Sequence, residues 1–121
     1  MKILLTGATG YIAQRLLPVL LGNSHEVICC VRDRARFDSE KYRSVSLSVL
    51  EVDFLKTETL QGIPADIDAA YYLIHSMSTS KGDFEKMEET SAINFRNCIQ
   101  RTKTRQVIYL SGIVNEEILS K

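Results

Sequence analysis

The sequence predicts an α/β protein whose doubly wound parallel sheet is covered by helices on both faces. Three observations lead to this prediction. Short apolar runs alternate with longer segments in which apolar residues recur every three or four positions. The short runs are apolar at consecutive positions, which is typical of strands buried on both sides. Right-handed crossovers between such strands then give a sheet in the order 3-2-1-4-5.

Five segments have the composition of buried strands. They are Lys2–Thr6, Glu26–Val31, Val45–Val52, Ala69–Ile74 and Gln106–Leu110. In a doubly wound sheet the last of these lies at one edge. Ligands of such sheets bind at the carboxyl ends of the strands, beside the first strand.

Two longer segments have the periodicity of helices. Tyr11–Leu21 has a broad apolar face, although Pro18 lies well inside it and should remove one backbone hydrogen bond. The sequence Gly22-Asn23 predicts that this helix ends in a left-handed cap. Asp83–Thr102 is the clearest helix, with glutamates near its positive N-terminal end. Between the third and fourth strands, Thr57–Leu60 predicts one or two short helical turns.

Composition excludes several classes of protein. The 121 residues have a formal net charge of zero and predict one domain, over 1–121, with no nucleic-acid or membrane partner. The longest apolar runs are far shorter than the ~20 residues that span a bilayer, and the first is too short for a signal peptide. Cys29, Cys30 and Cys98 lack metal-ligand spacing, so we expect buried thiols, no metal site and a cytoplasmic protein.

A glycine-rich turn joins the first strand to the first helix. Gly7, Gly10 and Ala13 are spaced G-x-x-G-x-x-A. Gly7 allows a tight turn, Gly10 leaves room for a pyrophosphate at the helix N-terminus, and Ala13 lets helix and strand pack closely. A turn without a ligand is the alternative, but the flanking strand and helix favour a dinucleotide site of the Rossmann type. The predicted contacts at this turn are Thr6, Gly7, Thr9, Gly10, Tyr11 and Ile12.

The end of the second strand bears on which dinucleotide binds. NAD-specific sites usually have Asp or Glu there for the ribose 2′-hydroxyl, whereas Arg accepts a 2′-phosphate. Val31 takes the acidic position and Arg32 follows it, which favours NADP. Asp33 keeps NAD open as the alternative, since a shift of one residue would bring it to the ribose. Arg34 and Arg36 are interpreted as parts of a solvated face.

Segments along nearly the whole chain resemble one known superfamily. The runs TGATGYIAQRLLPVLL, VRDRAR, VLEVDFL, AAYYLIHSM and QVIYLSG resemble the atypical, or extended-like, short-chain dehydrogenases/reductases, and among them the NmrA-like NAD(P)H-binding group. The resemblance implies that Asp53 accepts the exocyclic amine of adenine; the alternative is a turn residue that caps the following helix. It also implies that Ile74, His75 and Ser76 line the phosphate and ribose path, mostly through backbone groups. A structural role is the alternative for His75.

The sequence departs from this superfamily in its catalytic residues. Enzymes of the superfamily usually carry a Tyr, with a Lys four residues later, beyond the fifth strand. None of the five tyrosines here is followed by Lys at that spacing. Ser111 lies near the family's serine without these partners, and Asn94 is either the family's helix asparagine or an ordinary polar residue. We therefore predict no catalytic residue in this chain and no activity of the chain alone.

Two functions are consistent with these features. The first is the cofactor-binding domain of an oxidoreductase or epimerase. The second is a dinucleotide-binding redox sensor or interaction module without chemistry, and a flavin on the same turn is a third. Because the sequence stops soon after the fifth strand, we expect a truncated sheet and a chain that is part of a longer protein. The apolar edge left there predicts a homodimer.

Overall fold

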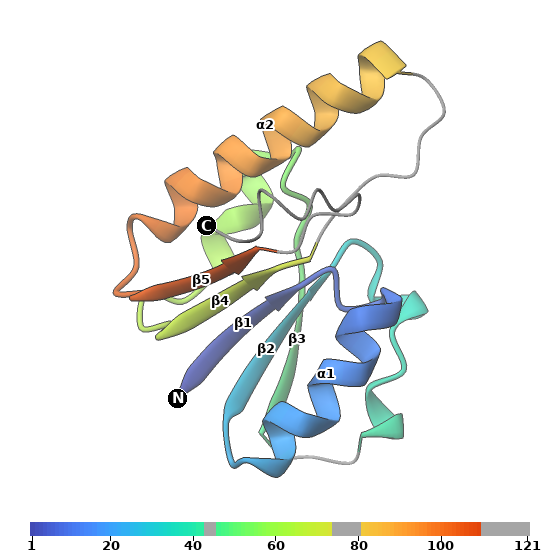
Figure 1. Cartoon of the computed structure of the whole chain (residues 1–121), viewed down its shortest axis with the longest axis vertical. Helices are drawn as coiled ribbons and strands as arrows, with labels where there is room; N and C mark the ends of the chain where they lie inside the picture. The colour runs from blue at the N-terminus through green and yellow to red at the C-terminus, as the bar shows by residue number, and fades with distance from the viewer. Residues whose placement is uncertain (43–45, 74–80, 110–121) are drawn as a thin grey trace, which may run out of the picture.

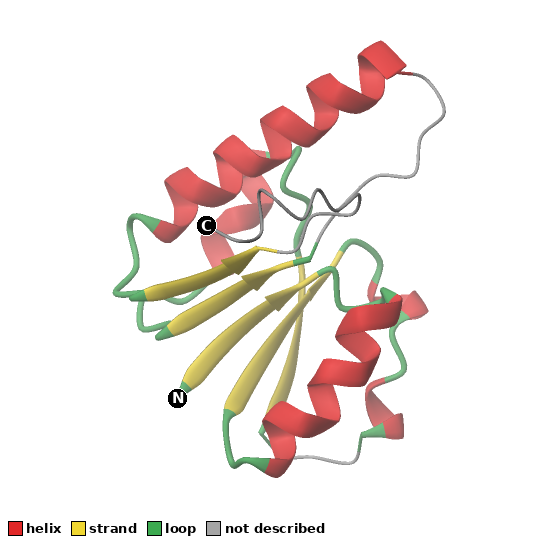
Figure 2. Ribbon diagram, in the orientation of Figure 1, coloured by secondary structure: helices red, strands yellow, loops and turns green. Residues whose placement is uncertain are grey.

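The strands form one parallel sheet in the order β3-β2-β1-β4-β5, as predicted (Figure 1). The structure is a computed structural model, which describes residues 1–42, 46–73 and 81–109. The strands are β1 (Lys2–Thr6), β2 (Glu26–Val31), β3 (Leu47–Glu51), β4 (Ala69–Tyr72) and β5 (Gln106–Tyr109). All five arrows in Figure 2 point the same way, which agrees with the parallel register of every strand pair.

Two α-helices lie on opposite faces of this sheet (Figure 1). They are α1 (Tyr11–Gly22) and α2 (Lys81–Ile99). In the described part of the crossover from β2 to β3, the helical elements are the 3₁₀ turns η1 (Arg34–Arg36) and η2 (Ser39–Lys41). A third turn, η3 (Thr57–Gly62), packs on the same face as α2.

The predicted bounds of several elements need correction. The strand predicted from Val45 begins at Leu47, because its ladder with β2 starts at the pair Val27↔Leu47. The second helix ends at Ile99 rather than Thr102, whose N–H and hydroxyl both donate to the Ile99 carbonyl. It begins at Lys81, two residues before the predicted start. Val45, Ile74 and Leu110, at the predicted ends of three strands, lie outside the described residues.

The sheet separates two apolar clusters, one under each α-helix. Leu5 and Leu17 belong to the cluster on the α1 face, and Leu4 and Phe95 belong to the cluster on the α2 face. Neighbouring residues of a strand point to opposite faces, so consecutive apolar residues supply both clusters. This explains why the central strands β1 and β2 have runs of consecutive apolar residues.

The cysteines are core residues, as predicted. Cys29 is buried on the α1 face, and Cys30 and Cys98 are buried on the α2 face, all as free thiols. Burial raises the pKa of Cys29 to about 12 and also raises the pKa of Cys30 and Cys98. All three therefore stay protonated at neutral pH and contribute to packing as small apolar side chains.

Helix α1 runs through Pro18 and ends differently from the prediction. The left-handed residue is Ser24, with a φ of 68°, and not Gly22 or Asn23. Ser24 N–H donates to the Leu21 carbonyl, and His25 N–H donates to the Leu20 carbonyl. These two bonds define a Schellman motif in which Ser24 takes the place usually held by glycine.

The left-handed Ser24 predicts that a glycine at this position stabilises the protein. A side chain in this conformation costs about 1–2 kcal/mol. Glycine removes this cost, but it also increases the conformational entropy of the unfolded chain, which offsets part of the stabilisation. We expect Ser24→Gly to raise the free energy of unfolding by roughly 0.5–1 kcal/mol in urea titrations. The control is Asn23→Gly, at a φ of −96° and with loss of the Asn23 Nδ2 bond to Val19 O, which should bring no gain. Equal effects of the two changes would contradict the prediction.

β5 lies at one edge of the sheet, as predicted, and β3 lies at the other. On the α2 side, Tyr109 of β5 contacts the rings of Tyr72 and Phe95. Over the described ranges, no helix combines the length and apolar character that crossing a membrane requires.

Candidate functional site

The site begins where β1 and β4 separate. The ladder between them ends at the pair Leu5↔Tyr71, and at Gly7, with a φ of 66°, the chain turns off β1. The fully buried Thr6 hydroxyl donates to the Tyr71 carbonyl at 2.8 Å and accepts from Leu73 N–H at 3.2 Å. It thereby satisfies two backbone groups of the β4 end that the β1 backbone no longer reaches.

This geometry gives the Thr6 hydroxyl a different role from the predicted contact with a cofactor. Its hydrogen-bonding capacity is used within the protein, and Thr6 does not line the cleft beside the turn. Its effect on a ligand is through the position of Gly7, which follows it in the chain.

Removal of the Thr6 hydroxyl should destabilise the fold. Valine has nearly the same shape, but it leaves the Tyr71 carbonyl and the Leu73 N–H without their partner. Each unsatisfied buried group costs about 1–3 kcal/mol, so Thr6→Val should lower the free energy of unfolding by about 2–4 kcal/mol in urea titrations. Thr6→Ser keeps the hydroxyl and should recover most of this loss. A Thr6→Val protein as stable as the unmodified chain would contradict this role.

The turn after β1 leaves the N-terminus of α1 open. Gly10 N–H donates to the Gly7 carbonyl at 2.9 Å, and Gly10 then precedes the helix in an extended conformation. No side chain caps α1, and its first turn has no acidic residue. The first helical bond is from Gln14 N–H to the Gly10 carbonyl, so the preceding N–H groups have no partner within the helix. Such an end attracts anions.

Gly10 is also confined by space. A Cβ atom at this position would lie 3.2 Å from the Gly7 carbonyl oxygen. The close neighbour of Gly10 is thus the backbone of the turn itself, a constraint that is separate from the room for a pyrophosphate inferred from the sequence.

A cleft of about 540 Å³ lies at the carboxyl ends of β1 to β4. Five of the predicted site residues line it: Gly7, Thr9, Gly10, Arg32 and Asp53. Three others do not line it: Thr6, Tyr11 and Ile12. Tyr11 is exposed and stacks under the Arg15 guanidinium, which is 4.6 Å from the ring centroid. Ile74, His75 and Ser76 lie outside the described residues.

At the end of β2, the structure distinguishes Arg32 from its acidic neighbour. The Arg32 side chain is exposed at the cleft, and no described residue forms a hydrogen bond or ion pair with its guanidinium. The Asp33 carboxylate accepts the N–H of Ala35 at 3.0 Å and caps η1. Asp33 is thus engaged locally, whereas Arg32 is available to a ligand.

Arg34 is bound to β3 and differs in this from the solvated side chain inferred from the sequence. Its guanidinium donates to the Val49 carbonyl at 3.0 Å, and its N–H donates to the Glu51 carboxylate at 2.9 Å. These bonds attach η1 to the edge strand and fix the direction in which the chain leaves β2.

Asp53 closes the turn after β3 and lines the cleft, but it does not cap the following helical turn η3, whose N-cap is Lys56. One carboxylate oxygen, Oδ1, accepts the N–H of Leu55 at 2.9 Å and closes the turn after β3. The residue is half-buried and lines the cleft. Within the described residues its other carboxylate oxygen, Oδ2, has no partner, which leaves it available to a donor in the cleft.

The sequence analysis missed the wall of the cleft that α2 supplies. Met87, Glu88 and Ser91 line this wall, opposite Tyr72 at the end of β4. The Tyr72 and Ser91 hydroxyls form a buried hydrogen bond of 2.8 Å, and burial raises the pKa of Tyr72 above its ordinary value. Met87 and Ser91 are part of the helical periodicity that is visible in the sequence. Which end of this helix face lines the cleft depends on how α2 packs against the sheet, and the local sequence pattern does not show this.

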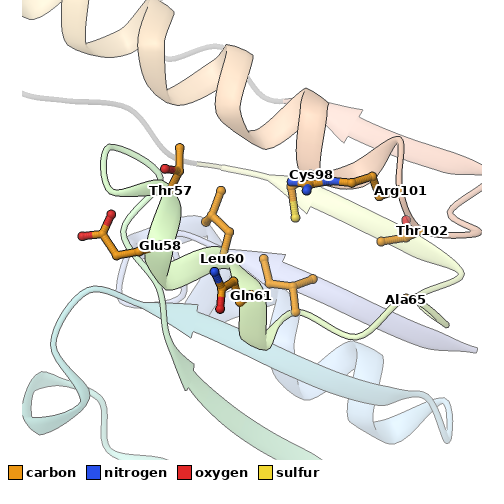
Figure 3. A pocket seen from close by; sticks show the side chains of 9 residues that line it. Thr57, Glu58, Leu60, Gln61, Ala65, Cys98, Arg101 and Thr102 are labelled. Carbon is orange, nitrogen blue, oxygen red and sulfur yellow. The ribbon is translucent and has the colours of Figure 1, made fainter.

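A second cavity, of about 520 Å³, lies between η3 and the C-terminal end of α2 (Figure 3). Thr57, Glu58 and Gln61 line it from η3, and Cys98 and Arg101 line it from the other side. None of the predicted site residues that the structure describes lines this cavity. Nor do His, Cys, Asp or Glu side chains gather in a group that fits a metal ion in the part of the chain that the structure describes.

The sheet order, the glycine turn and the cleft at the carboxyl ends define a dinucleotide-binding Rossmann fold. A family model described as NAD(P)H-binding matches residues 7–119. The chain therefore belongs to this NAD(P)H-binding family. No curated protein sequence matches the chain.

Solved structures of reductases and epimerases share the fold. Yeast methylglyoxal/isovaleraldehyde reductase, complexed with NADPH, matches 90% of this chain at 19% identity and a TM-score of 0.75. Gre2 from Candida albicans, also with NADPH, matches 90% at 21% identity and a TM-score of 0.75. UDP-N-acetylglucosamine 4-epimerase from Bacillus cereus matches 98% at 18% identity and a TM-score of 0.73. The chain spans only 36% of each of the first two proteins and 40% of the third.

Proposed function

We propose that the chain binds NADP(H) in preference to NAD(H), with the Arg32 guanidinium on the 2′-phosphate. The observation that carries this proposal is the contrast at the end of β2. Arg32 is exposed at the cleft without a partner among the described residues, while Asp33 caps η1. Asp33 does not line the cleft, so its carboxylate is poorly placed for a ribose hydroxyl, whereas the guanidinium of Arg32 lies at the cleft and fits a phosphate. The NADPH complexes of two proteins with this fold agree with the proposal.

The remaining contacts follow from the shape of the cleft. The bare turn at Gly7 and Gly10 and the open N-terminus of α1 fit a pyrophosphate, because N–H groups and the helix dipole meet there. Tyr11 and Ile12 act through their backbone N–H groups in this arrangement, since neither lines the cleft. Thr9 supplies a hydroxyl from the exposed side of the turn. Asp53 accepts the exocyclic amine of adenine, and Ile74, His75 and Ser76 are proposed for the phosphate and ribose path.

The test of the NADP preference is substitution of Arg32. A hydrogen bond to a charged group contributes about 1.5–3 kcal/mol, so Arg32→Ala should weaken NADPH binding by roughly ten- to a hundredfold. NADH carries no 2′-phosphate, and its dissociation constant should change little. Calorimetric titration of both cofactors measures the two constants. Equal affinities of the unmodified chain for NADPH and NADH would refute the preference.

Two valine substitutions on α1 serve as controls for the site itself. Gly10→Val places a side chain where the pyrophosphate would lie and should abolish binding of both cofactors. Gly22→Val adds the same side chain at the other end of the helix, where a Cβ meets nothing within 4 Å, and should leave binding unchanged. Thermal unfolding of both variants verifies that they fold. Unchanged affinity in a folded Gly10→Val protein would refute the pyrophosphate site.

The proposal assigns no catalytic residue. The first candidate function is the cofactor-binding domain of an oxidoreductase or epimerase, which the shared fold supports. The second is a dinucleotide-binding sensor or interaction module, which requires only the cofactor site that these residues form. Consumption of NADPH with an aldehyde substrate would favour the first function. Cofactor binding without turnover by the whole protein would favour the second.

We also propose that the chain forms a homodimer through its β5 side. β5 is an edge strand whose backbone groups on one side have no strand partner among the described residues, and such edges promote association. On the same side of the molecule, α2 exposes Met87 and Ile93. A symmetric dimer is the commonest way to cover such surfaces.

Lysine substitutions distinguish the strand edge from the helix. Ile108→Lys adds a charge to the edge strand and should shift the protein from dimer to monomer in sedimentation at roughly tens of micromolar. Ile93→Lys changes α2 alone and should have the smaller effect. Ile113, beyond β5, is a second candidate for such a substitution, and it lies outside the described residues. A monomeric unmodified chain at this concentration would refute the dimer.

A cytoplasmic location is proposed as well. The three cysteines are unpaired thiols whose pKa values are raised by burial. Chains with unpaired thiols and no disulfide are typical of reducing compartments.

A further inference from the structure

The α2 wall of the cleft carries two polar side chains that reach different strands. Ser91 and Asn94 are three positions apart and so lie on the same side of the helix. The Ser91 hydroxyl bonds the Tyr72 hydroxyl, at the end of β4. The Asn94 amide Nδ2 donates to the Phe54 carbonyl, in the loop after β3, at 2.6 Å. β3 and β4 are separated in the sheet by β2 and β1, so α2 connects strand ends that the sheet does not join directly.

The loop after β3 is held from a second side by η3. Asp53 N–H donates to the Thr59 hydroxyl at 2.9 Å. That hydroxyl lies 3.0 Å from the Asp53 carbonyl and 2.7 Å from the Lys56 carbonyl, and it donates to these acceptors in turn. Thr59 therefore fixes the backbone of Asp53, and the Leu55 N–H fixes one carboxylate oxygen.

The side chain of Phe54 anchors the same loop in the core. It is buried and contacts the rings of Phe95 and Tyr72, with centroids 5.6 Å and 6.3 Å away. Packing alone sets how deep the loop lies, but it does not set the direction of the Phe54 peptide. The Asn94 amide sets that direction, because a hydrogen bond to a carbonyl has a preferred line of approach.

We propose that Asn94 and Thr59 are positioning residues that aim the free carboxylate oxygen of Asp53 at the amine of a bound adenine. This inference rests on the proposed cofactor site and adds to it the residues that determine base recognition. Neither side chain lines the cleft, so both act through Asp53 rather than by contact with the ligand. Their loss should reduce discrimination between bases more than it reduces the stability of the domain.

The experiment compares NADPH with its hypoxanthine analogue, in which a carbonyl oxygen replaces the exocyclic amine of adenine. A carboxylate accepts a hydrogen bond from the amine and repels the carbonyl. The unmodified 121-residue chain should therefore bind NADPH roughly tenfold more tightly than the analogue. Asn94→Ala should reduce this ratio to about two or less. The control is Asn97→Ala, at an exposed position one turn further along α2, which should keep the full ratio.

A second pair of variants tests the same loop from η3 and leaves α2 intact. Thr59→Val removes the hydroxyl with little change of shape and should lower the ratio as Asn94→Ala does. Thr59→Ser keeps the hydroxyl and should restore the ratio. This pair decides the question if Asn94→Ala does not fold.

The outcomes separate this inference from the proposed function. If the unmodified chain binds neither dinucleotide, the proposed function fails and this inference fails with it. If the chain binds NADPH but folded Asn94→Ala and Thr59→Val proteins keep the unmodified ratio, only the positioning role is refuted. Loss of the ratio in Asn97→Ala as well would mean that α2 acts through its helix stability, and it would also refute the role.

Discussion

The hydrogen bonds of the Thr6 hydroxyl are the constraint on which the rest of the site depends. At Thr6 the strand β1 ends in a turn, while β4 extends beyond its ladder with β1. Both strand ends are buried, so their backbone groups need hydrogen-bond partners. One side-chain hydroxyl replaces the pairing that the departing strand can no longer provide. The chain can then turn at Gly7 without loss of order in β4, and a cleft opens at the reversal of strand order.

The cleft is framed by segments that are distant in the sequence. The glycine turn before α1 supplies one side, the end of β2 supplies a cation, and the loop after β3 supplies a carboxylate. Helix α2 closes the remaining side and is bonded both to β4 and to that loop. A shift of α2 would therefore move the walls on either side of a bound base together, which makes the helix part of the site as well as part of the core.

The strands, their order and the glycine turn could be predicted from sequence because they depend on local periodicity and on general rules of crossover handedness. The details that required the structure are hydrogen bonds between segments. Arg32 and Asp33 are adjacent in sequence and both fit a ribose contact, and only the structure shows that Arg32 lines the cleft whereas Asp33 caps η1 outside its lining. Gly22 is the expected left-handed residue by composition, yet the Schellman bonds place that conformation at Ser24. The partner of Asn94 lies 40 residues away in sequence, beyond any local pattern.

The two adjacent cysteines of β2 give this protein a built-in measure of how each half of its interior opens. Cys29 is packed under α1, and Cys30 faces the opposite layer together with Cys98. A thiol reagent reaches each sulfur only when the layer above it separates from the sheet, so the labelling rate reports a local opening free energy. Because Cys29 and Cys30 are neighbours on one strand, a difference between their labelling rates reports a difference in how readily the two layers separate from the sheet. Saturation with a dinucleotide would then reveal which layer the ligand holds closed.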